Sequence, residues 1–359
     1  MSGETGMRLA LPGKGALESA TLAFLAEAGM KVNRSNPRQY LARISSMPDL
    51  EVVFQRAADV PLLVQEGDAT LGITGYDILA EHRGRAEGVD DDEEDDYDDD
   101  LIVLERNLGY GSCRLVVAVP ETWIDVSTCA DLWHLAGYYF THKGRGLRIA
   151  TKYPILTGQF LRRHGITHCK IISPHGALEA APLTDTADLI VDLTETGTTL
   201  RENHLKLLDD GVVLRSQACL IANARLLKQN KQALGMASTM LELIDARVQA
   251  RNRSMLTAHL RIEDSEKIPR IYEQLESRVV SVQLRPTNVD TDGNHTVGAG
   301  EYTLAGMVNV GSSNAELLET IAVLRGIGAA YIDITPLTYR FEEESQSVRS
   351  LRERLKRLT

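Results

Sequence analysis

Short apolar strands alternate with helical stretches along the first hundred residues, and this alternation constrains the fold more than any other feature of the chain. A strand at 8–12 ends in a glycine turn and is followed by a helix at 17–28. A second strand at 50–56, a helix that begins at Asp59 with an early proline, and a third strand at 71–75 continue the pattern. Such alternation predicts a mostly parallel sheet with helices on both of its faces.

The alternation stops at an acidic run and then starts again. Strands at 113–119, 148–151 and 170–172, with a helix at 155–164, form a second α/β unit. A further apolar segment at 187–193 is expected to be a buried strand that leads into a polar turn. Two α/β units in succession predict two lobes, with ligands bound in a cleft near the carboxyl ends of the strands.

The last third of the chain has a different pattern. A long helix at 236–252 is expected to link it to the lobes. Four strands and two helices follow, with the strands at 255–260, 279–284, 302–310 and 330–334 and the helices at 265–276 and 315–326. This set of elements predicts a small α+β domain of the ferredoxin-like kind.

The net charge of −11 comes almost entirely from one segment. The run at 90–100 holds ten acidic residues and one tyrosine, so it supplies −10 and leaves −1 for the rest of the chain. We interpret the run as a solvated insertion rather than as a cation site, because like charges at this density repel one another. The near-neutral remainder lacks the basic stripe that nucleic-acid binding needs, so no nucleic acid is expected as a partner.

The distribution of cysteines and apolar residues points to a cytoplasmic protein. Cys113, Cys129, Cys169 and Cys219 are scattered without CxxC spacing, which argues against a zinc site or a disulfide framework and fits a reducing compartment. No apolar run approaches the roughly 20 residues that cross a bilayer, so no membrane association is expected. The short polar segment at the start of the sequence has no apolar core of a secretory signal.

The polar turn after the strand at 187–193 is the strongest functional motif. It reads Asp192-Leu193-Thr194-Glu195-Thr196-Gly197-Thr198-Thr199-Leu200. A phosphate monoester needs several donors from one side, which backbone N–H groups at a helix start and threonine hydroxyls provide. Gly197 permits positive φ and a close approach of the backbone. The same pattern also fits an ordinary capped turn between a strand and a helix.

The turn belongs to a longer series of motifs. Preceding it are Glu179-Ala180-Ala181-Pro182 and Ala187-Asp188, and four further segments of the series stand at 56–61, 71–75, 111–115 and 148–154. In these motifs, their order and their spacing, the chain resembles the long form of the ATP phosphoribosyltransferases, which open histidine biosynthesis. The resemblance covers roughly residues 7–340.

The resemblance implies a fold and a reaction. The fold would be a two-lobed, periplasmic-binding-protein-like α/β core with a small C-terminal α+β, ACT-like regulatory domain. The reaction would transfer the 5-phosphoribosyl group of phosphoribosyl pyrophosphate to N1 of ATP and release pyrophosphate, with Mg²⁺ as cofactor. The resemblance also implies feedback inhibition by histidine and a homo-oligomer in which dimers assemble into a hexamer. Lobe I would comprise residues 1–103 and 203–250, and lobe II would comprise residues 104–202. The regulatory domain would comprise residues 254–341, and residues 342–359 would form a charged tail that is expected to be a frayed helix.

The resemblance also assigns roles to individual residues. The phosphoribosyl pyrophosphate site is expected to comprise Asp192, Thr194, Glu195, Thr196, Gly197, Thr198 and Thr199. The ATP site is expected to comprise Lys14, Gly15, Arg56, Gly72, Thr74, Gly75 and Lys152. The catalytic residues are expected to be Asp192, Glu179 and Arg56, of which Asp192 and Glu179 are also candidate metal ligands. Ser281 is the candidate allosteric residue.

Simpler interpretations of several of these residues stay open. Arg56 could form a plain surface ion pair, and Glu179 could be a solvated loop carboxylate. The glycines at 72 and 75 could mark only a tight turn. The whole chain could be a different phosphoribosyltransferase on the same scaffold, or a two-lobed binding or sensing protein without catalysis.

Four departures from the family pattern are visible in the sequence. The acidic run at 90–100 stands where the family has a shorter connection. Ala16 stands where the family usually has an arginine, so one expected nucleotide contact is missing. Asp185 stands where a glycine is frequent and adds a negative charge near the substrate loop. In the C-terminal domain, the segment at 278–282 replaces the usual Pro-Thr segment.

Overall fold

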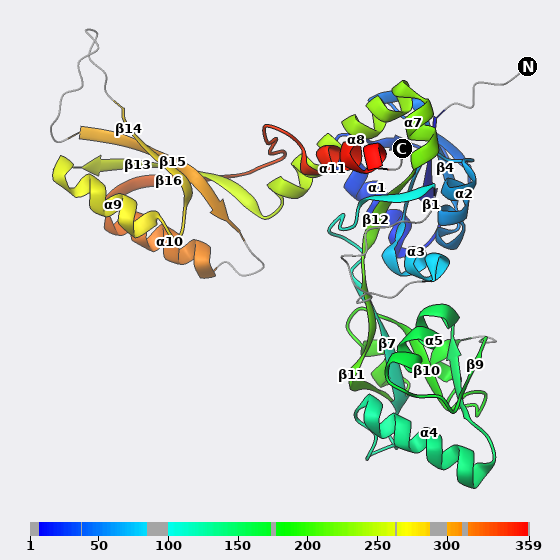
Figure 1. Cartoon of the computed structure of the whole chain (residues 1–359). Helices are drawn as coiled ribbons and strands as arrows, with labels where there is room; N and C mark the ends of the chain where they lie inside the picture. The colour runs from blue at the N-terminus through cyan, green and yellow to red at the C-terminus, as the bar shows by residue number, and fades with distance from the viewer. Residues whose placement is uncertain are drawn as a thin grey trace, which may run out of the picture. The chain divides into compact units, whose positions relative to one another are not determined.

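The computed structural model describes residues 7–36, 38–84, 100–173, 177–262, 264–287, 300–310 and 315–357, and they form two compact units (Figure 1). Unit 1 comprises Met1–Leu241 and Ser347–Thr359, and unit 2 comprises Glu242–Gln346. Unit 2 is therefore an insertion in the sequence of unit 1. Of the acidic run at 90–100, all but Asp100 lies outside the described residues.

Unit 1 contains two lobes, but two expectations about them are wrong. The strand at 205–216, expected in lobe I, belongs to the sheet of lobe II, and four of the six strand pairings in the lobe I sheet are antiparallel, so that sheet is not mostly parallel. Lobe I is built on a seven-stranded sheet in the order β2 (Val32–Asn33), β3 (Leu41–Ile44), β4 (Met47–Gln55), β1 (Met7–Pro12), β5 (Leu71–Gly75), β12 (Ala218–Asn223) and β6 (Leu101–Glu105). Its helices are α1 (Ala16–Glu27), η1 (Ala57–Asp59), α2 (Val60–Glu66), α3 (Tyr76–Arg83), α7 (Ala224–Gln229) and the first part of α8 (Lys231–Ala250).

The centre of this sheet explains its apolar sequence. β1 lies between β4 and β5 and is parallel to both. Leu9, Ala10 and Leu11 are fully buried, as expected for a parallel strand that is covered on both faces. Pro12 lies opposite Gln55 in the register, so the carboxyl ends of these parallel strands meet at one edge of the sheet.

Lobe II is built on a five-stranded sheet. The order is β11 (Leu205–Ser216), β7 (Cys113–Pro120), β10 (Leu189–Thr194), β8 (Leu147–Thr151) and β9 (Cys169–Ile172). Its helices are α4 (Cys129–Lys143), α5 (Pro154–Arg163), η2 (Leu178–Ala180) and α6 (Thr198–Glu202). Because β10, β8 and β9 are mutually parallel, their carboxyl ends also lie at one edge.

The two sheets are joined where β11 passes into β12. Ser216 pairs with Cys113 in the lobe II sheet, and Ala218 pairs with Gly75 in the lobe I sheet. Only Gln217 separates these two pairings, and its carbonyl accepts the Tyr76 N–H at 2.8 Å. The strand ends of the two lobes therefore adjoin the same short junction.

Unit 2 has the ferredoxin-like order predicted from its sequence. Its antiparallel sheet has the order β14 (Val280–Pro286), β15 (Gly300–Asn309), β13 (Arg253–Ile262) and β16 (Ala329–Pro336). The helical elements are η3 (Ser265–Lys267), α9 (Ile268–Leu275) and α10 (Ala315–Gly326), and α9 and α10 lie on one face of the sheet (Figure 1). Ile271, Leu275 and Leu324 of these helices pack with Leu256 and Leu304 of the strands, which closes a core of its own.

The charged C-terminal segment differs from the expected frayed helix. α11 (Gln346–Arg357) is ordered, and Val348 and Leu351 are buried. Ser347 Oγ donates to Glu105 at 3.1 Å and Arg354 donates to the carbonyl of Val103 at 2.8 Å. The helix thus packs beside β6, an edge strand of lobe I, because its apolar residues recur at helical spacing on one face.

None of the helices within the described ranges combines the length and the apolar character needed to cross a membrane.

Candidate active site

The turn at the end of β10 is held by its own side chains. The Gly197 N–H donates to the hydroxyl of buried Thr194 at 2.8 Å, and Gly197 has φ +79°. A left-handed backbone of this kind favours glycine, so the residue at 197 closes the turn just before α6 begins at Thr198. Thr194 therefore lies inside the turn, where it holds the backbone, rather than on its outer surface.

The outer surface of the turn carries hydroxyls and a guanidinium. Thr196, Thr198 and Thr199 are exposed, and the hydroxyls of Thr196 and Thr198 are 2.9 Å apart. Arg201 lies along the turn, with its guanidinium donating to the Thr196 carbonyl and the Thr198 hydroxyl, each at 3.3 Å. The turn can therefore offer a planar cationic donor together with hydroxyls to one anion.

Arg201 was missed in the sequence analysis, although a signal for it exists. A residue three positions after Thr198 returns to the same side of a helix that begins at Thr198. An arginine at that spacing after a threonine-rich turn is hence placed over the turn by helical geometry alone.

The carboxylates and lysine expected at the same site are brought together. Asp192 lies in β10, Lys152 follows the parallel strand β8, and Glu179 lies in η2. The pKa of Asp192 is raised, mainly by burial and also by the negative charge of Glu179. Two groups act against this rise: the Leu193 N–H, which donates to the Asp192 carboxylate at 2.8 Å, and the positive charge of Lys152. Because Val191 lies opposite Thr151 in the parallel register, Asp192 and Lys152 are the next residues of neighbouring strands at the edge of the lobe II sheet, and the charge of Glu179 also acts there.

Among the described residues, one group of three candidate metal ligands comes together, and it lies elsewhere in lobe II. The ligand atoms of Cys129, His164 and Asp210 lie within 4.8 Å of one another. The Asp210 carboxylate already accepts the Cys129 N–H at 2.7 Å, and its carbonyl accepts the thiol at 3.7 Å. These contacts hold the first turn of α4, and burial raises the pKa of the Cys129 thiol to about 12.

The cationic residues expected to bind ATP follow two adjacent strands of lobe I. Lys14 follows β1 and Arg56 follows β4, and both are exposed. The Gly13 N–H donates to the Gln55 carbonyl at 2.7 Å, so the two loops leave the sheet together. Gly15, with φ +82°, then begins α1. The parallel pairing of β1 with β4 thus gathers two positive charges at the edge where ligands bind in open α/β sheets.

Gly72 and Thr74, also expected at the ATP site, lie inside lobe I. A Cβ at Gly72 would stand 2.7 Å from Val60 Cγ1 and 2.8 Å from Val64 Cγ2, so this glycine makes room for α2. Thr74 is fully buried and its hydroxyl donates to the Ala57 carbonyl at 2.9 Å. The side chains at both positions serve the packing of β5 against η1 and α2.

Comparison with known proteins supplies the family. The family model described as ATP phosphoribosyltransferase matches residues 56–246, which include Arg56, Lys152, Glu179 and the whole turn after β10. The chain belongs to the ATP phosphoribosyltransferase family. The expectation drawn from the sequence motifs is confirmed.

Two curated relatives and one solved structure extend the comparison. The ATP phosphoribosyltransferase 2, chloroplastic, of Arabidopsis thaliana is 34% identical over 345 residues, which cover 96% of this chain and 79% of the relative. The ATP phosphoribosyltransferase of Brucella melitensis is 44% identical over 219 residues, 60% of this chain and 90% of the relative. A structure of the ATP phosphoribosyl transferase (HisG:HisZ) complex from Thermotoga maritima aligns with a TM-score of 0.49 at 27% identity, over 67% of this chain and 98% of that chain.

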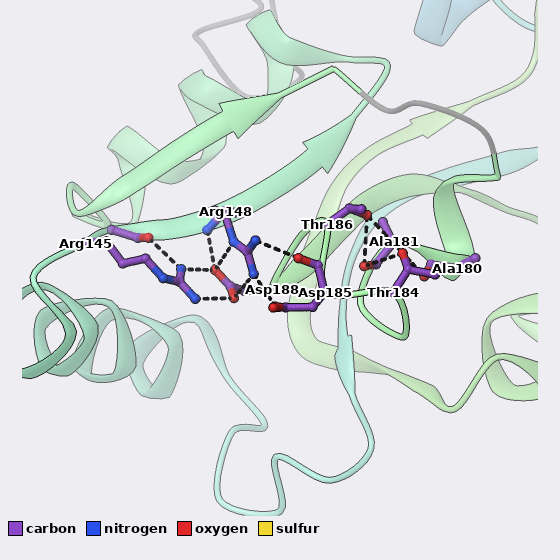
Figure 2. Close-up of polar contacts among 9 residues, drawn as sticks. Arg145, Arg148, Ala180, Ala181, Thr184, Asp185, Thr186 and Asp188 are labelled. Atoms are coloured by element: carbon purple, nitrogen blue, oxygen red, sulfur yellow. Dashed lines mark hydrogen bonds and ion pairs between the residues drawn. The ribbon is translucent and has the colours of Figure 1, made fainter.

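The family departure at Asp185 has a structural explanation. Asp185 has φ +53°, a conformation that glycine adopts more easily. Its carboxylate pairs with Arg148 at 2.5 Å, and the same guanidinium donates to the Asp185 carbonyl at 2.7 Å and to Asp188 (Figure 2). The additional negative charge is therefore paired with an arginine of β8.

Asp188 anchors the same network from inside the lobe. Its buried carboxylate accepts from Arg145 at 2.5 and 2.9 Å and from the Arg148 backbone N–H at 2.7 Å (Figure 2). Burial alone would raise the pKa of Asp188, but the hydrogen bonds from the two arginines outweigh it and hold the pKa far below its ordinary value. The family's Ala-Asp motif thereby fixes the start of β10.

The candidate allosteric residue lies at an irregularity of the unit 2 sheet. Ser281 has φ +57°, and the register of β14 with β15 shifts between Val280 and Gln283. Gly306 of β15 lies beneath this bulge, since a Cβ there would stand 2.3 Å from Val279 Cγ1. Ser281 therefore lies on a strand that is locally bent.

Proposed function

We propose that the exposed hydroxyls of Thr196 and Thr198, with the guanidinium of Arg201, bind the 5-phosphate of phosphoribosyl pyrophosphate. The reaction of the family joins C1 of this substrate to N1 of ATP and releases pyrophosphate. The observation that carries the assignment is the convergence of these three side chains on one turn at a parallel strand end. Thr199 is exposed on the same turn and adds a further hydroxyl. Glu195, also exposed there, is a candidate for the ribose hydroxyls, because a carboxylate facing the phosphate would repel it.

ATP is assigned to the strand ends of lobe I. Lys14 and Arg56 offer two exposed cations from adjacent loops, and such cations suit the triphosphate of ATP. Lys152 of lobe II adjoins Asp192 and is assigned to a phosphate between the two substrates.

The chemistry assigned to the site requires positioning more than proton transfer. N1 of adenine has a free lone pair, so no strong base is needed for its attack on C1. The barrier lies in breaking the bond from C1 to the pyrophosphate while positive charge develops on the ribose. Asp192 and Glu179 are assigned to this region, where they hold the ribose hydroxyls and face the developing charge.

Asp192 and Glu179 also fit the needs of a magnesium ion. Mg²⁺ binds oxygen ligands and is commonly held by one or two carboxylates together with substrate phosphates. The two carboxylates are close enough for the charge of one to raise the pKa of the other. When bound there, Mg²⁺ would neutralise the leaving pyrophosphate.

The assignment of the turn is tested by pyrophosphate release from ATP and phosphoribosyl pyrophosphate. In Thr198→Val combined with Gly197→Ala, we expect a loss of ~100-fold in rate, since a few kcal/mol of phosphate binding disappear.

Arg201→Met is expected to raise KM for phosphoribosyl pyrophosphate about 10-fold and to leave KM for ATP unchanged. Thr239→Val, which removes an exposed hydroxyl from α8, is the control. Near-normal turnover of the protein with Thr198→Val and Gly197→Ala would contradict the assignment of this turn to the 5-phosphate.

Unit 2 is proposed to be a regulatory domain that binds histidine. Its separate core and its ferredoxin-like order suit a module that binds a small ligand, and Ser281 on the bent strand β14 is the candidate contact. Isothermal titration of the whole protein with histidine tests the proposal. The absence of binding at millimolar histidine would contradict it.

The assembly and compartment are also proposals. Family resemblance favours dimers that assemble into a hexamer in the cytoplasm. Light scattering of the purified protein gives the molar mass directly, and a monomer at micromolar concentration would contradict the proposed assembly.

A further inference from the structure

Helix α3 contributes to the cores of both lobes. Leu79 packs with Val60 and Cys219 in the core of lobe I, whereas Ala80 packs with Leu115 and Leu156 in the core of lobe II. The two residues are adjacent in sequence and point to different sides of the helix. α3 is therefore a spacer that both lobes contact.

The first turn of α3 places a buried carboxylate between the lobes. Asp77 is 4% exposed, and each of its two carboxylate oxygens accepts a hydrogen bond. Ser216 Oγ donates to one oxygen at 2.6 Å, and Tyr153 Oη donates to the other at 2.6 Å. Ser216 also accepts the Asp77 N–H at 2.8 Å. Tyr153 comes from lobe II and Ser216 from the junction, so Asp77 joins both to lobe I.

One turn further along α3, Glu81 makes a second connection to lobe II. Its two oxygens accept the backbone N–H groups of Ile155 and Leu156 at 2.8 and 2.9 Å. Because α5 begins at Pro154, which has no N–H, these are the first donors that the helix offers. A carboxylate at a helix N-terminus is favoured by the helix dipole, so Glu81 caps α5 from the other lobe.

These contacts adjoin the two halves of the proposed active site. Tyr153 directly follows Lys152, and Thr151 lies opposite Val191 in the parallel register, so Tyr153 comes shortly after the point where β8 lies beside β10. Burial is the main cause that raises the pKa of Tyr153, and the charge of Asp77 raises it further. On the lobe I side, a Cβ at Gly75 would stand 2.5 Å from Asp77 Oδ1. A side chain at position 75 would therefore crowd the Asp77 oxygen that accepts from Ser216.

We propose that Asp77, Glu81 and Tyr153 form an interlobe clamp that fixes the two substrate sites at a set separation before the substrates bind. The clamp residues are positioning residues: each substrate binds to its own lobe, and the clamp decides how far N1 of ATP lies from C1 of the ribose. This inference rests on the site assignments proposed above. It predicts that the clamp affects the transfer step more than the binding of either substrate.

The test compares Tyr153→Phe with Tyr110→Phe. Tyr110 is a matched control, since it is also a partly buried tyrosine, and its hydroxyl donates at 3.0 Å to Thr21 of lobe I. For Tyr153→Phe and Asp77→Asn, we expect kcat to fall at least ~10-fold, because small misplacements of reacting atoms are costly. The dissociation constants of ATP alone and of phosphoribosyl pyrophosphate alone, measured by isothermal titration, should stay within about 2-fold of the parent protein, a difference below 1 kcal/mol.

A double-mutant cycle makes the result specific to the Asp77–Tyr153 contact. The loss in Asp77→Asn with Tyr153→Phe should be smaller than the sum of the two single losses, because both substitutions weaken the same contact. Glu81→Gln provides a milder second variant if Asp77→Asn does not fold, and it should lower kcat in the same direction. Unchanged kcat in Tyr153→Phe would overturn the proposal, and so would a loss of affinity for one substrate with normal kcat. Lack of pyrophosphate release by the parent protein would instead contradict the proposed function itself.

Discussion

At the scale of single residues, Asp192 is the carboxylate whose environment most directly affects the proposed chemistry. Its pKa is raised by burial, lowered by the Leu193 N–H, raised by the charge of Glu179 and lowered by the charge of Lys152. An acid with a raised pKa in the folded protein binds its proton more tightly there than in the unfolded chain. Ionised Asp192 therefore opposes folding at neutral pH, and this opposition disappears as the pH falls through the raised pKa.

The same environment predicts the pH dependence of the reaction. If ionised Asp192 is required, kcat/KM should fall on the acid side at a pH above the ordinary aspartate value of about 3.9. Glu179→Gln should move this acid limb of the pH profile, the range over which kcat/KM falls, to lower pH, because it removes a neighbouring negative charge. Lys152→Met should move it to higher pH, because it removes a neighbouring positive charge.

The measurement is the kcat/KM of pyrophosphate release across the acid range for the parent and both variants. Only the position of the limb is compared, so a loss of absolute rate does not affect the conclusion. Lys170→Met is the control, since Lys170 is exposed on β9 and is not one of the charges acting on Asp192. A limb that both substitutions move in the same direction would contradict the prediction.

A second prediction at this scale compares how much the two aspartates that bind Arg148 contribute to the free energy of unfolding. Asp188 is buried and bonded to two arginines, so Asp188→Asn should lower the free energy of unfolding by about 3 kcal/mol. The carboxyl of Asp185 is 91% exposed, and its φ is positive, so Asp185→Gly should change stability by less than about 1 kcal/mol. Urea unfolding at pH 7 measures both, and equal losses would show that burial does not govern this network.

At the scale of elements, α11 and β6 form a pair that is distant in sequence. β6 is an edge strand, and exposed edges pair readily with other chains. α11 lies along it through Arg354 and the Val103 carbonyl, and it is held by buried Leu351. The helix thus covers part of this edge of the lobe I sheet.

This pairing predicts that loss of α11 promotes association. In Leu351→Asp, a charge would have to be buried, so we expect the helix to detach and the apparent molar mass from light scattering to rise with time at 37 °C. Glu353→Ala is the matched control on the exposed side of the helix. A stable, unchanged mass for Leu351→Asp would show that the edge is protected by other means.

At the scale of the whole molecule, the two units should unfold as separate transitions. Each has its own core, and the sequence of unit 1 resumes after unit 2. Gly306→Ala places a Cβ 2.3 Å from Val279, and overpacking of this kind costs about 2 kcal/mol, so it should lower the transition of unit 2 only. Leu351→Ala, although it follows unit 2 in the sequence, should lower the transition of unit 1 by about 3 kcal/mol.

Differential scanning calorimetry of the parent and the two variants checks this prediction. The shifts should fall on different transitions, and histidine, if it binds unit 2, should raise the transition that Gly306→Ala lowers. A single transition shifted by both variants would mean that the two units unfold as one.

Elements such as α3, β11 and β12 were not predicted from the sequence. What the sequence by itself determined is the central strands of both lobes, the ferredoxin-like unit, the family and the turn at Gly197. These features depend on local spacing: apolar periodicity, a glycine where φ must be positive, and hydroxyl residues within one turn of one another. Thr196, Gly197 and Thr198 could be identified as a candidate phosphate site because they are neighbours along the chain.

Only the tertiary structure decided which side chains face that site. Gly72 and Thr74 are at a strand end in the sequence, but α2 and η1 cover them. Asp77 and Tyr153 are 76 residues apart, and the junction of the two sheets brings them to 2.6 Å. No local pattern encodes such contacts, because they depend on strand pairings and helix packing between distant segments, and those pairings are set by the burial of the whole core.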